Sequence, residues 1–71
     1  MTDPVYKLLE LTGTSSKSLE DAVQNAIGHA AKTVRNIRWF EVTGTRGYVD
    51  DGVVKQWQVS LKVGFSLEDS D

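Results

Sequence analysis

The sequence predicts an α+β fold in the order strand, helix, strand, strand, with a three-stranded antiparallel sheet curled around one amphipathic helix. Three observations support this order. Apolar residues between positions 19 and 34 recur at helical spacing, positions 53 to 65 alternate between apolar and polar as in a strand, and Asp51-Gly52 is a strong hairpin signal. The chain has 71 residues. We therefore expect a single domain over residues 1–71.

The first strand is expected over Val5–Thr12, a short segment rich in valine, leucine and tyrosine that ends at Gly13. A polar loop over residues 14–17 should follow. Ser18 then has the chemistry of a helix N-cap, and the next turn carries two carboxylates, which the helix dipole favours. The sequence thus predicts a strand, a short loop and a helix start at position 18.

The helix is expected to span about 17 residues and to stop at Asn36, with Lys32 and Arg35 near its end, where cations are favoured. Its alanines at positions 22, 26 and 30 allow its backbone to lie close to the sheet, which we interpret as packing. The apolar positions of the stripe are Leu19, Ala22, Val23, Ala26, Ile27, Ala30 and Val34.

Two further strands, Ile37–Val49 and Val53–Phe65, should pair antiparallel across the turn at Asp51-Gly52. A two-residue loop makes the numbers of paired residues sum to 103, and Gly44 and Gly47 are candidate bulge positions. The pairs expected from this register are Trp39 with Gly64, Phe40 with Val63, Glu41 with Lys62, and Thr43 with Ser60.

Trp39 is predicted to point away from the core. Val59, Leu61, Val63 and Phe65 alternate with polar or small residues, so the apolar side of the third strand faces the helix together with Phe40 and Val42. Successive residues of a strand point to opposite faces, which puts Trp39 on the polar side with Gln58. By the same parity Trp57 belongs with the core, where we interpret it as a packing residue.

Nothing in the chain remains to cover this second face of the sheet, so another copy of the chain, a ligand, or both must cover it. From the residues alone, Trp39 is as well suited to anchor a protein interface as to bind a ligand. Without further information, Gln58 is interpreted as an ordinary polar residue of a sheet face. Arg46 is interpreted as a solvated surface charge. Trp39 lies six strand positions from Gln58, about 20 Å, so one planar ligand touching both would bridge two subunits.

Composition narrows the remaining function classes. The chain has no cysteine and one histidine, so neither disulfides nor a structural zinc can support so small a core, and self-association remains. A net charge of −2 gives no reason to expect nucleic acid as a partner. No apolar run is long enough to cross a membrane and no secretory signal is present, so we expect a cytoplasmic protein. The titratable residues form no catalytic constellation, and we expect no enzyme activity.

Five short segments occur in the expected order of elements: Gly-Thr-Ser at 13–15, Arg-Trp-Phe-Glu-Val at 38–42, Arg-Gly at 46–47, Gln-Val at 58–59 and Lys-Val-Gly-Phe at 62–65. With these segments the chain resembles the dodecin family of flavin-binding proteins, over residues 5–68. A calcium-associated branch of the family lacks the tryptophan that matches Trp39, so the resemblance places this chain with the flavin binders.

The resemblance implies a hollow homododecamer in which pairs of flavins are sandwiched between symmetry-related tryptophans. It implies that Trp39 stacks on the flavin ring, that Gln58 hydrogen-bonds the polar end of the ring, and that Arg46 contacts the phosphate of FMN. Ser66 stands where many bacterial relatives have arginine, which leaves riboflavin and FAD as other candidate ligands. The expected function is flavin storage with quenching of flavin photochemistry; the alternative is a structural homo-oligomer or protein-interaction module without flavin.

Overall fold

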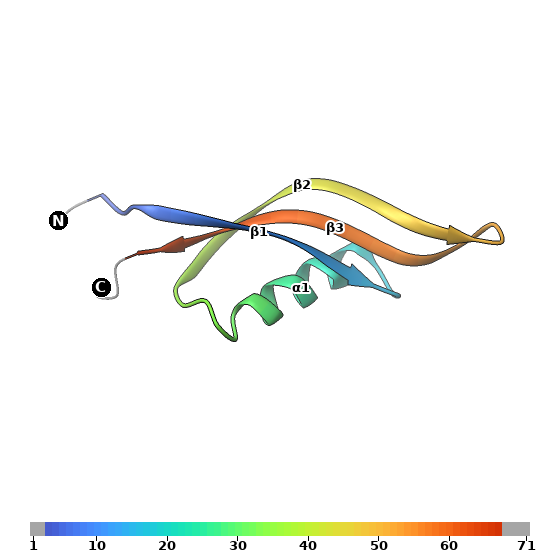
Figure 1. The fold of residues 1–71 in the computed structure, drawn as a ribbon, viewed down its shortest axis with the longest axis horizontal. Helices are drawn as coiled ribbons and strands as arrows, with labels where there is room; N and C mark the ends of the chain where they lie inside the picture. Colours follow the sequence, from blue (N-terminus) through green and yellow to red (C-terminus); the bar gives the residue numbers. More distant parts are fainter. Residues whose placement is uncertain (1–2, 68–71) are drawn as a thin grey trace.

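The computed structural model describes residues 3–67 and has the predicted order of elements (Figure 1). They are strand β1 (Tyr6–Ser15), helix α1 (Leu19–Ala30), strand β2 (Ile37–Asp50) and strand β3 (Val53–Ser66). The three strands form an antiparallel sheet in the order β1-β3-β2, so β3 is central and α1 lies on one side of the sheet. The predicted fold class is therefore confirmed: a β-α-β-β chain with one helix on a three-stranded antiparallel sheet.

The start of α1 was predicted correctly, but its end was not. The Ser18 hydroxyl accepts a hydrogen bond from the Asp21 backbone N–H at 3.0 Å, as an N-cap does. The helix ends at Ala30, because the N–H groups of Lys32 and Thr33 bond to carbonyls three residues back and tighten the chain into a turn. Asn36, the predicted stop, has a φ of 66° and directs the chain into β2.

Strand β1 continues to Ser15, so the predicted end before Gly13 and the loop beginning at residue 14 were wrong. Gly13 is a point of close packing rather than a strand end: it pairs with Val59, and a Cβ there would lie 2.8 Å from the Cβ of Ala26. Ser15 is buried, and its hydroxyl donates to an Asp21 carboxylate oxygen at 2.7 Å. Glycine at position 13 thus lets the helix lie directly on the strand.

The core lies between α1 and the strands β1 and β3. Its buried apolar residues are Ala22, Ala26, Ala30, Val59, Leu61 and Val63, and the partly buried apolar residues packed against its main cluster are Leu11, Leu19, Val23, Ile27 and Ile37. The alanine stripe predicted to face the sheet is confirmed. Trp57 lies on the helix side of the sheet, as its parity predicts, but it is half-buried and belongs to neither group, so the expectation that it is a core residue was wrong.

Phe40 and Val42 pair with Val63 and Leu61, so they face the helix side of the sheet as predicted. They are nevertheless 48% and 43% exposed. The helix packs on β1 and β3, whereas β2 is an edge strand, and the β2–β3 hairpin extends well past the helix (Figure 1). The expectation that these two residues are core residues was therefore wrong, because α1 packs on β1 and β3 and does not extend sideways over β2.

The predicted pairing of β2 with β3 is correct near Trp39 and shifts beyond it. Trp39 pairs with Gly64 and Glu41 with Lys62, as expected. A bulge between Val42 and Gly44 leaves Thr43 without a partner across the ladder and places Gly44, not Thr43, opposite Ser60. The Thr43 hydroxyl instead donates to the Ser60 carbonyl at 3.1 Å.

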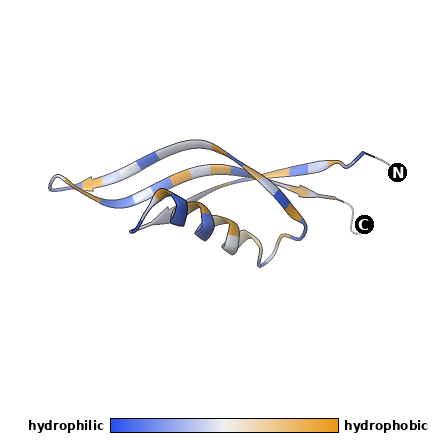
Figure 2. Cartoon of the chain, turned by 180° about the vertical axis from the view of Figure 1, so that it is seen from behind, coloured by the Kyte–Doolittle hydropathy of each residue, from blue (hydrophilic) through white to orange (hydrophobic). Residues whose placement is uncertain are grey.

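Two other shifts lie between Ile37 and Trp39 and between Tyr48 and Val49, whereas Gly47 pairs with Trp57 without one. The bulge expected near Gly44 is thus confirmed, and the one expected at Gly47 was wrong. Orange and blue alternate along the strands and around the helix in Figure 2, as the sequence pattern predicts. Within residues 3–67, no helix has the length and apolar character needed to cross a membrane.

Candidate functional site

The face of the sheet opposite α1, here called the outer face, is covered by no element of residues 3–67 (Figure 1). The register of the three strands fixes which side chains share this face. An aromatic region lies where β3 ends, and a polar region lies toward the hairpin. In strand order these residues include Tyr6, Leu8, Glu10 and Thr12 from β1, Trp39, Glu41 and Arg46 from β2, and Gln58, Ser60, Lys62 and Gly64 from β3.

The Trp39 indole lies flat against the backbone of β3 at Gly64. A Cβ added to Gly64 would lie 2.7 Å from Cδ2 of the indole and closer still to two other ring atoms, so only glycine accommodates the ring in this position. The Tyr6 ring contacts the indole edge-on, with centroids 5.7 Å apart and an interplanar angle of 77°. Trp39 remains 38% exposed. The indole is thus held by the Gly64 backbone on one face and by the Tyr6 ring beside it, while part of the indole stays exposed.

Arg46 and Gln58 are paired residues on β2 and β3, in the polar region of the outer face. The Arg46 Nη1 donates to the Ser60 hydroxyl at 3.1 Å, and that hydroxyl lies 3.0 Å from the hydroxyl of Thr12. The Gln58 amide Nε2 donates to Oε1 of Gln56 at 2.8 Å. The guanidinium still has donors for an anion, because a guanidinium carries five N–H groups.

The structure brings Arg46 and Gln58 together and leaves Trp39 apart from both. Gln58 and Gly64, the partner of Trp39, are six positions apart on β3, which is about 20 Å at the usual strand rise. One chain therefore presents two half-sites rather than one complete pocket. A single planar ligand that touches both half-sites must lie between two copies of the chain.

Sequence reasoning missed three neighbours of these residues: Tyr6 beside Trp39, and the pair Thr12 and Ser60 beside Arg46. Two of them belong to β1, and the sequence holds no turn that fixes the register of β1 against β3. Ser60 was expected on this face, but opposite Thr43, because the bulge at Thr43 could not be located from the sequence. The alternation of β1 at Tyr6, Leu8, Glu10 and Thr12 was the only signal that could have placed these side chains on one face.

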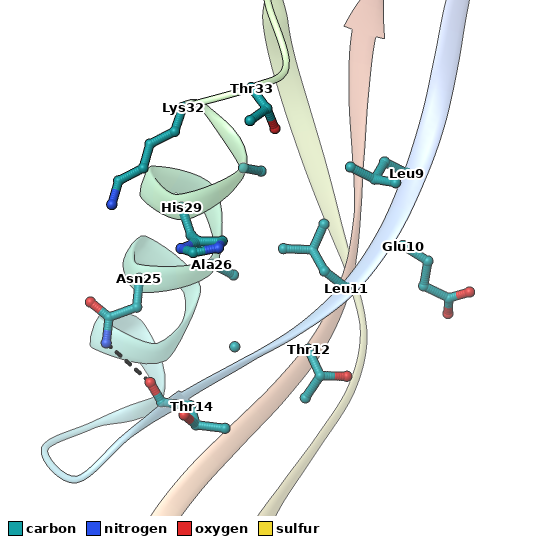
Figure 3. A pocket seen from close by; sticks show the side chains of 12 residues that line it. Leu9, Glu10, Leu11, Thr12, Thr14, Asn25, Ala26, His29, Lys32 and Thr33 are labelled. Carbon is teal, nitrogen blue, oxygen red and sulfur yellow. Dashed lines mark hydrogen bonds between the residues drawn. The ribbon is translucent and has the colours of Figure 1, made fainter.

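A cavity of about 750 Å³ lies elsewhere, in a groove between α1 and the edge of β1 (Figure 3). Leu11, Ala26 and His29 line it, and the Asn25 side chain closes one end by donating to the Thr14 carbonyl at 3.0 Å. Trp39, Arg46 and Gln58 are not among its lining residues. Residues 3–67 contain no cluster of three or more histidine, cysteine, aspartate or glutamate side chains arranged to hold a metal ion.

A β-α-β-β fold with a fixed but partly exposed indole on an uncovered sheet face is typical of a small binding protein. The comparisons with known proteins are consistent with this class. The family model described as Dodecin matches residues 5–68. The chain belongs to the dodecin family.

Individual dodecins are similar to this chain over nearly their whole length. The dodecin of Thermus thermophilus is 50% identical over 66 residues, which are 93% of this chain and 96% of that protein. The structure of dodecin from Streptomyces coelicolor is 47% identical, with a TM-score of 0.90, and the match covers 99% of this chain and 100% of that one. A calcium dodecin of Mycobacterium tuberculosis, described as calcium chelating, is 32% identical with a TM-score of 0.78, covering 94% and 96% of the two chains.

Proposed function

We propose that this protein binds flavin, with FMN as the preferred form, and stores it between the Trp39 side chains of two copies of the chain. The assembly we propose is a hollow homododecamer, the form that its family resemblance implies. The single observation that carries the proposal is the position of Trp39, an indole fixed on the outer face of the sheet and left partly exposed. Membership of the dodecin family supports the choice of flavin as ligand.

The geometry around Trp39 fits a planar aromatic ligand. The indole rests on the Gly64 backbone and is held edge-on by Tyr6, so it is ordered before a ligand arrives. Preorganisation of this kind reduces the entropy lost on binding. An isoalloxazine ring stacked on an indole buries a large apolar area on both partners, and offset stacking of two aromatic systems is favourable. Trp39 of a second copy would supply the same surface on the far side of a stacked pair of flavins.

The polar region offers the groups that the edges of such a ligand require. Gln58 carries both a donor and an acceptor, which suits the mixed donor and acceptor edge of a flavin ring. Arg46 can bind a phosphate with two parallel hydrogen bonds, which favours FMN over uncharged riboflavin. Because these residues lie about 20 Å from Trp39 along the sheet, they serve a ring held by the Trp39 of another copy.

Storage fits this arrangement better than catalysis does. A ring covered on one face by an indole and on the other by the second flavin of the pair is closed to a second substrate, and neither half-site brings together a nucleophile and a base. An excited flavin in contact with tryptophan can be deactivated by electron transfer from the indole before it reacts. We therefore propose that binding both sequesters the flavin and suppresses its photochemistry.

A fluorescence titration tests the flavin proposal. FMN is titrated with the wild-type protein and with the variants Trp39→Phe and Trp39→Ala, and Trp57→Phe is the matched control, since Trp57 lies half-buried on the helix side of the sheet. We expect strong quenching with wild type and with Trp57→Phe, weaker binding with Trp39→Phe, and loss of quenching with Trp39→Ala. Equal quenching by all four proteins would refute the role of Trp39.

The second candidate is a homo-oligomer in which the outer face meets another copy without flavin. The observation that favours it is the number of large apolar side chains left exposed by one chain, which is high for so small a protein. In that case FMN fluorescence would be unchanged by the wild-type protein, while Trp39→Ala would still reduce the assembly size on a sizing column. Quenching that depends on Trp39 excludes this alternative.

A further inference from the structure

A continuous set of side-chain hydrogen bonds crosses all three strands in the polar region of the outer face. It begins at Thr12 on β1, passes through the Ser60 hydroxyl on β3, and ends at the guanidinium of Arg46 on β2. The two distances are 3.0 Å and 3.1 Å. Arg46 can only donate, so the Ser60 oxygen must accept from it, which leaves the Ser60 proton free to bond to Thr12.

The backbone of β2 is shaped to allow this contact. Arg46 pairs with Gln58, so its side chain must extend diagonally across the ladder to reach Ser60, which is two residues further along β3. The residue opposite Ser60 is Gly44, and a Cβ built there would already lie 3.5 Å from Nη2 of Arg46. A larger side chain at this position would compete with the guanidinium for the same space.

The bulge at Thr43 is what places Gly44, and not a threonine side chain, opposite Ser60. The Thr43 hydroxyl bonds to the Ser60 carbonyl at 3.1 Å and ties the bulge to β3. The bulge, Gly44 and the hydroxyls of Ser60 and Thr12 therefore all influence the position of the Arg46 guanidinium. An exposed arginine without such contacts would sample many rotamers, and fixing it on binding would cost entropy.

We propose that Ser60, supported by Thr12, is a positioning residue that holds Arg46 over the outer face and thereby sets the preference for a phosphorylated over an unphosphorylated flavin. This role rests on the proposed function: Ser60 and Arg46 together would determine which flavin the protein prefers. Ser60 itself need not touch the ligand. It orders the guanidinium, whose remaining N–H donors are left to bind the phosphate dianion.

The test compares the ratio of FMN to riboflavin affinities, measured by fluorescence titration at low salt, for wild type, Arg46→Ala, Ser60→Ala and Ser60→Thr. We expect Arg46→Ala to lower the FMN preference about tenfold, as for loss of a charge-assisted hydrogen bond. Ser60→Ala should lower it by about twofold to tenfold, the worth of one ordinary hydrogen bond. Ser60→Thr keeps the hydroxyl, so its ratio of FMN to riboflavin affinities should be close to that of wild type.

The control is Thr45→Ala, which removes a hydroxyl from the residue next to Arg46 on the helix side of β2. It should leave the ratio unchanged, and riboflavin affinity should be similar in all variants that assemble. A wild-type ratio in Ser60→Ala together with a reduced ratio in Arg46→Ala would overturn the positioning role alone. An unchanged ratio in Arg46→Ala would overturn it as well, because Ser60 would then have no phosphate contact to support. Absence of any flavin binding by wild type would instead refute the proposed function, and the positioning role with it.

Discussion

At the scale of single residues, the pair Trp39 and Gly64 is the most specific feature of the molecule. The two residues are partners across β2 and β3, and the absence of a side chain at position 64 lets the indole lie on the backbone. The sequence predicted this pairing from the Asp51-Gly52 turn, and the prediction holds because the shift between Tyr48 and Val49 and the bulge between Val42 and Gly44 offset each other and restore the register at this end of the hairpin. It could not show that the ring would lie flat on the strand or that Tyr6 would hold it edge-on.

Replacing Gly64 by alanine tests this contact. The new methyl group would occupy the space of the indole, so either the ring moves away or the strand shifts, at a cost of about 1–3 kcal/mol in unfolding free energy. Because the displaced ring would no longer be ordered for stacking, FMN affinity should fall about tenfold or more. Urea denaturation and FMN titration of Gly64→Ala measure both effects. Wild-type affinity in this variant would show that the position of the ring on Gly64 does not matter for binding.

At the scale of elements, the contact between α1 and β1 depends on Gly13, a glycine whose place in the sequence suggested a strand end. Gly13 is buried, and a Cβ there would collide with the backbone carbonyl of Ala22 and lie 2.8 Å from the Cβ of Ala26. Periodicity identified the alanine stripe of the helix correctly, since it depends on local spacing. It could not reveal which residue of the sheet the stripe would meet, because that depends on how two distant segments pack.

A comparison of two glycine substitutions tests this packing. Gly13→Ala should destabilise the fold by about 1–3 kcal/mol, because the helix must move off the strand. Gly28→Ala is the matched control: Gly28 is an exposed helical residue with nothing within 4 Å of its added Cβ. It should stabilise the protein by about 0.5–1 kcal/mol through helix propensity. Equal effects of the two changes on the thermal midpoint would contradict the close-packing role of Gly13.

At the scale of the whole molecule, the large apolar surface that a single chain leaves exposed favours self-association over a monomer. The molecule is elongated, with extents of 55 × 20 × 14 Å, and the hairpin of β2 and β3 projects beyond the helix (Figure 1). Seven large apolar side chains of this hairpin are exposed: Trp39, Phe40, Val42, Tyr48, Val49, Val53 and Val54. The sequence predicted self-association from the small core and the bare outer face, but it placed Phe40 and Val42 in the core because alternation shows facing and not coverage.

The assembly can be tested by placing a charge on this uncovered strand. Val42→Asp changes a residue that one chain leaves 43% exposed, so the cost to the fold should be small and the cost to the assembly large. Native mass spectrometry should show wild type as a species many times heavier than the 7.9 kDa chain, and the variant as small species. Gln24→Glu, on the exposed side of α1, should assemble as wild type does. Assembly of Val42→Asp to full size would mean that this surface is not an interface.

The most direct test of the central claim is a crystal structure of the wild-type protein grown with FMN. We expect electron density for the isoalloxazine ring against the exposed side of the Trp39 indole, with the Trp39 of a second copy completing the stack. Gln58 should approach the polar edge of the ring, and Arg46 should approach the phosphate. Both residues should belong to a different copy of the chain from the Trp39 that stacks on the same ring. A structure in which the Trp39 rings pack against protein alone, and FMN lies elsewhere or is absent, would contradict the account.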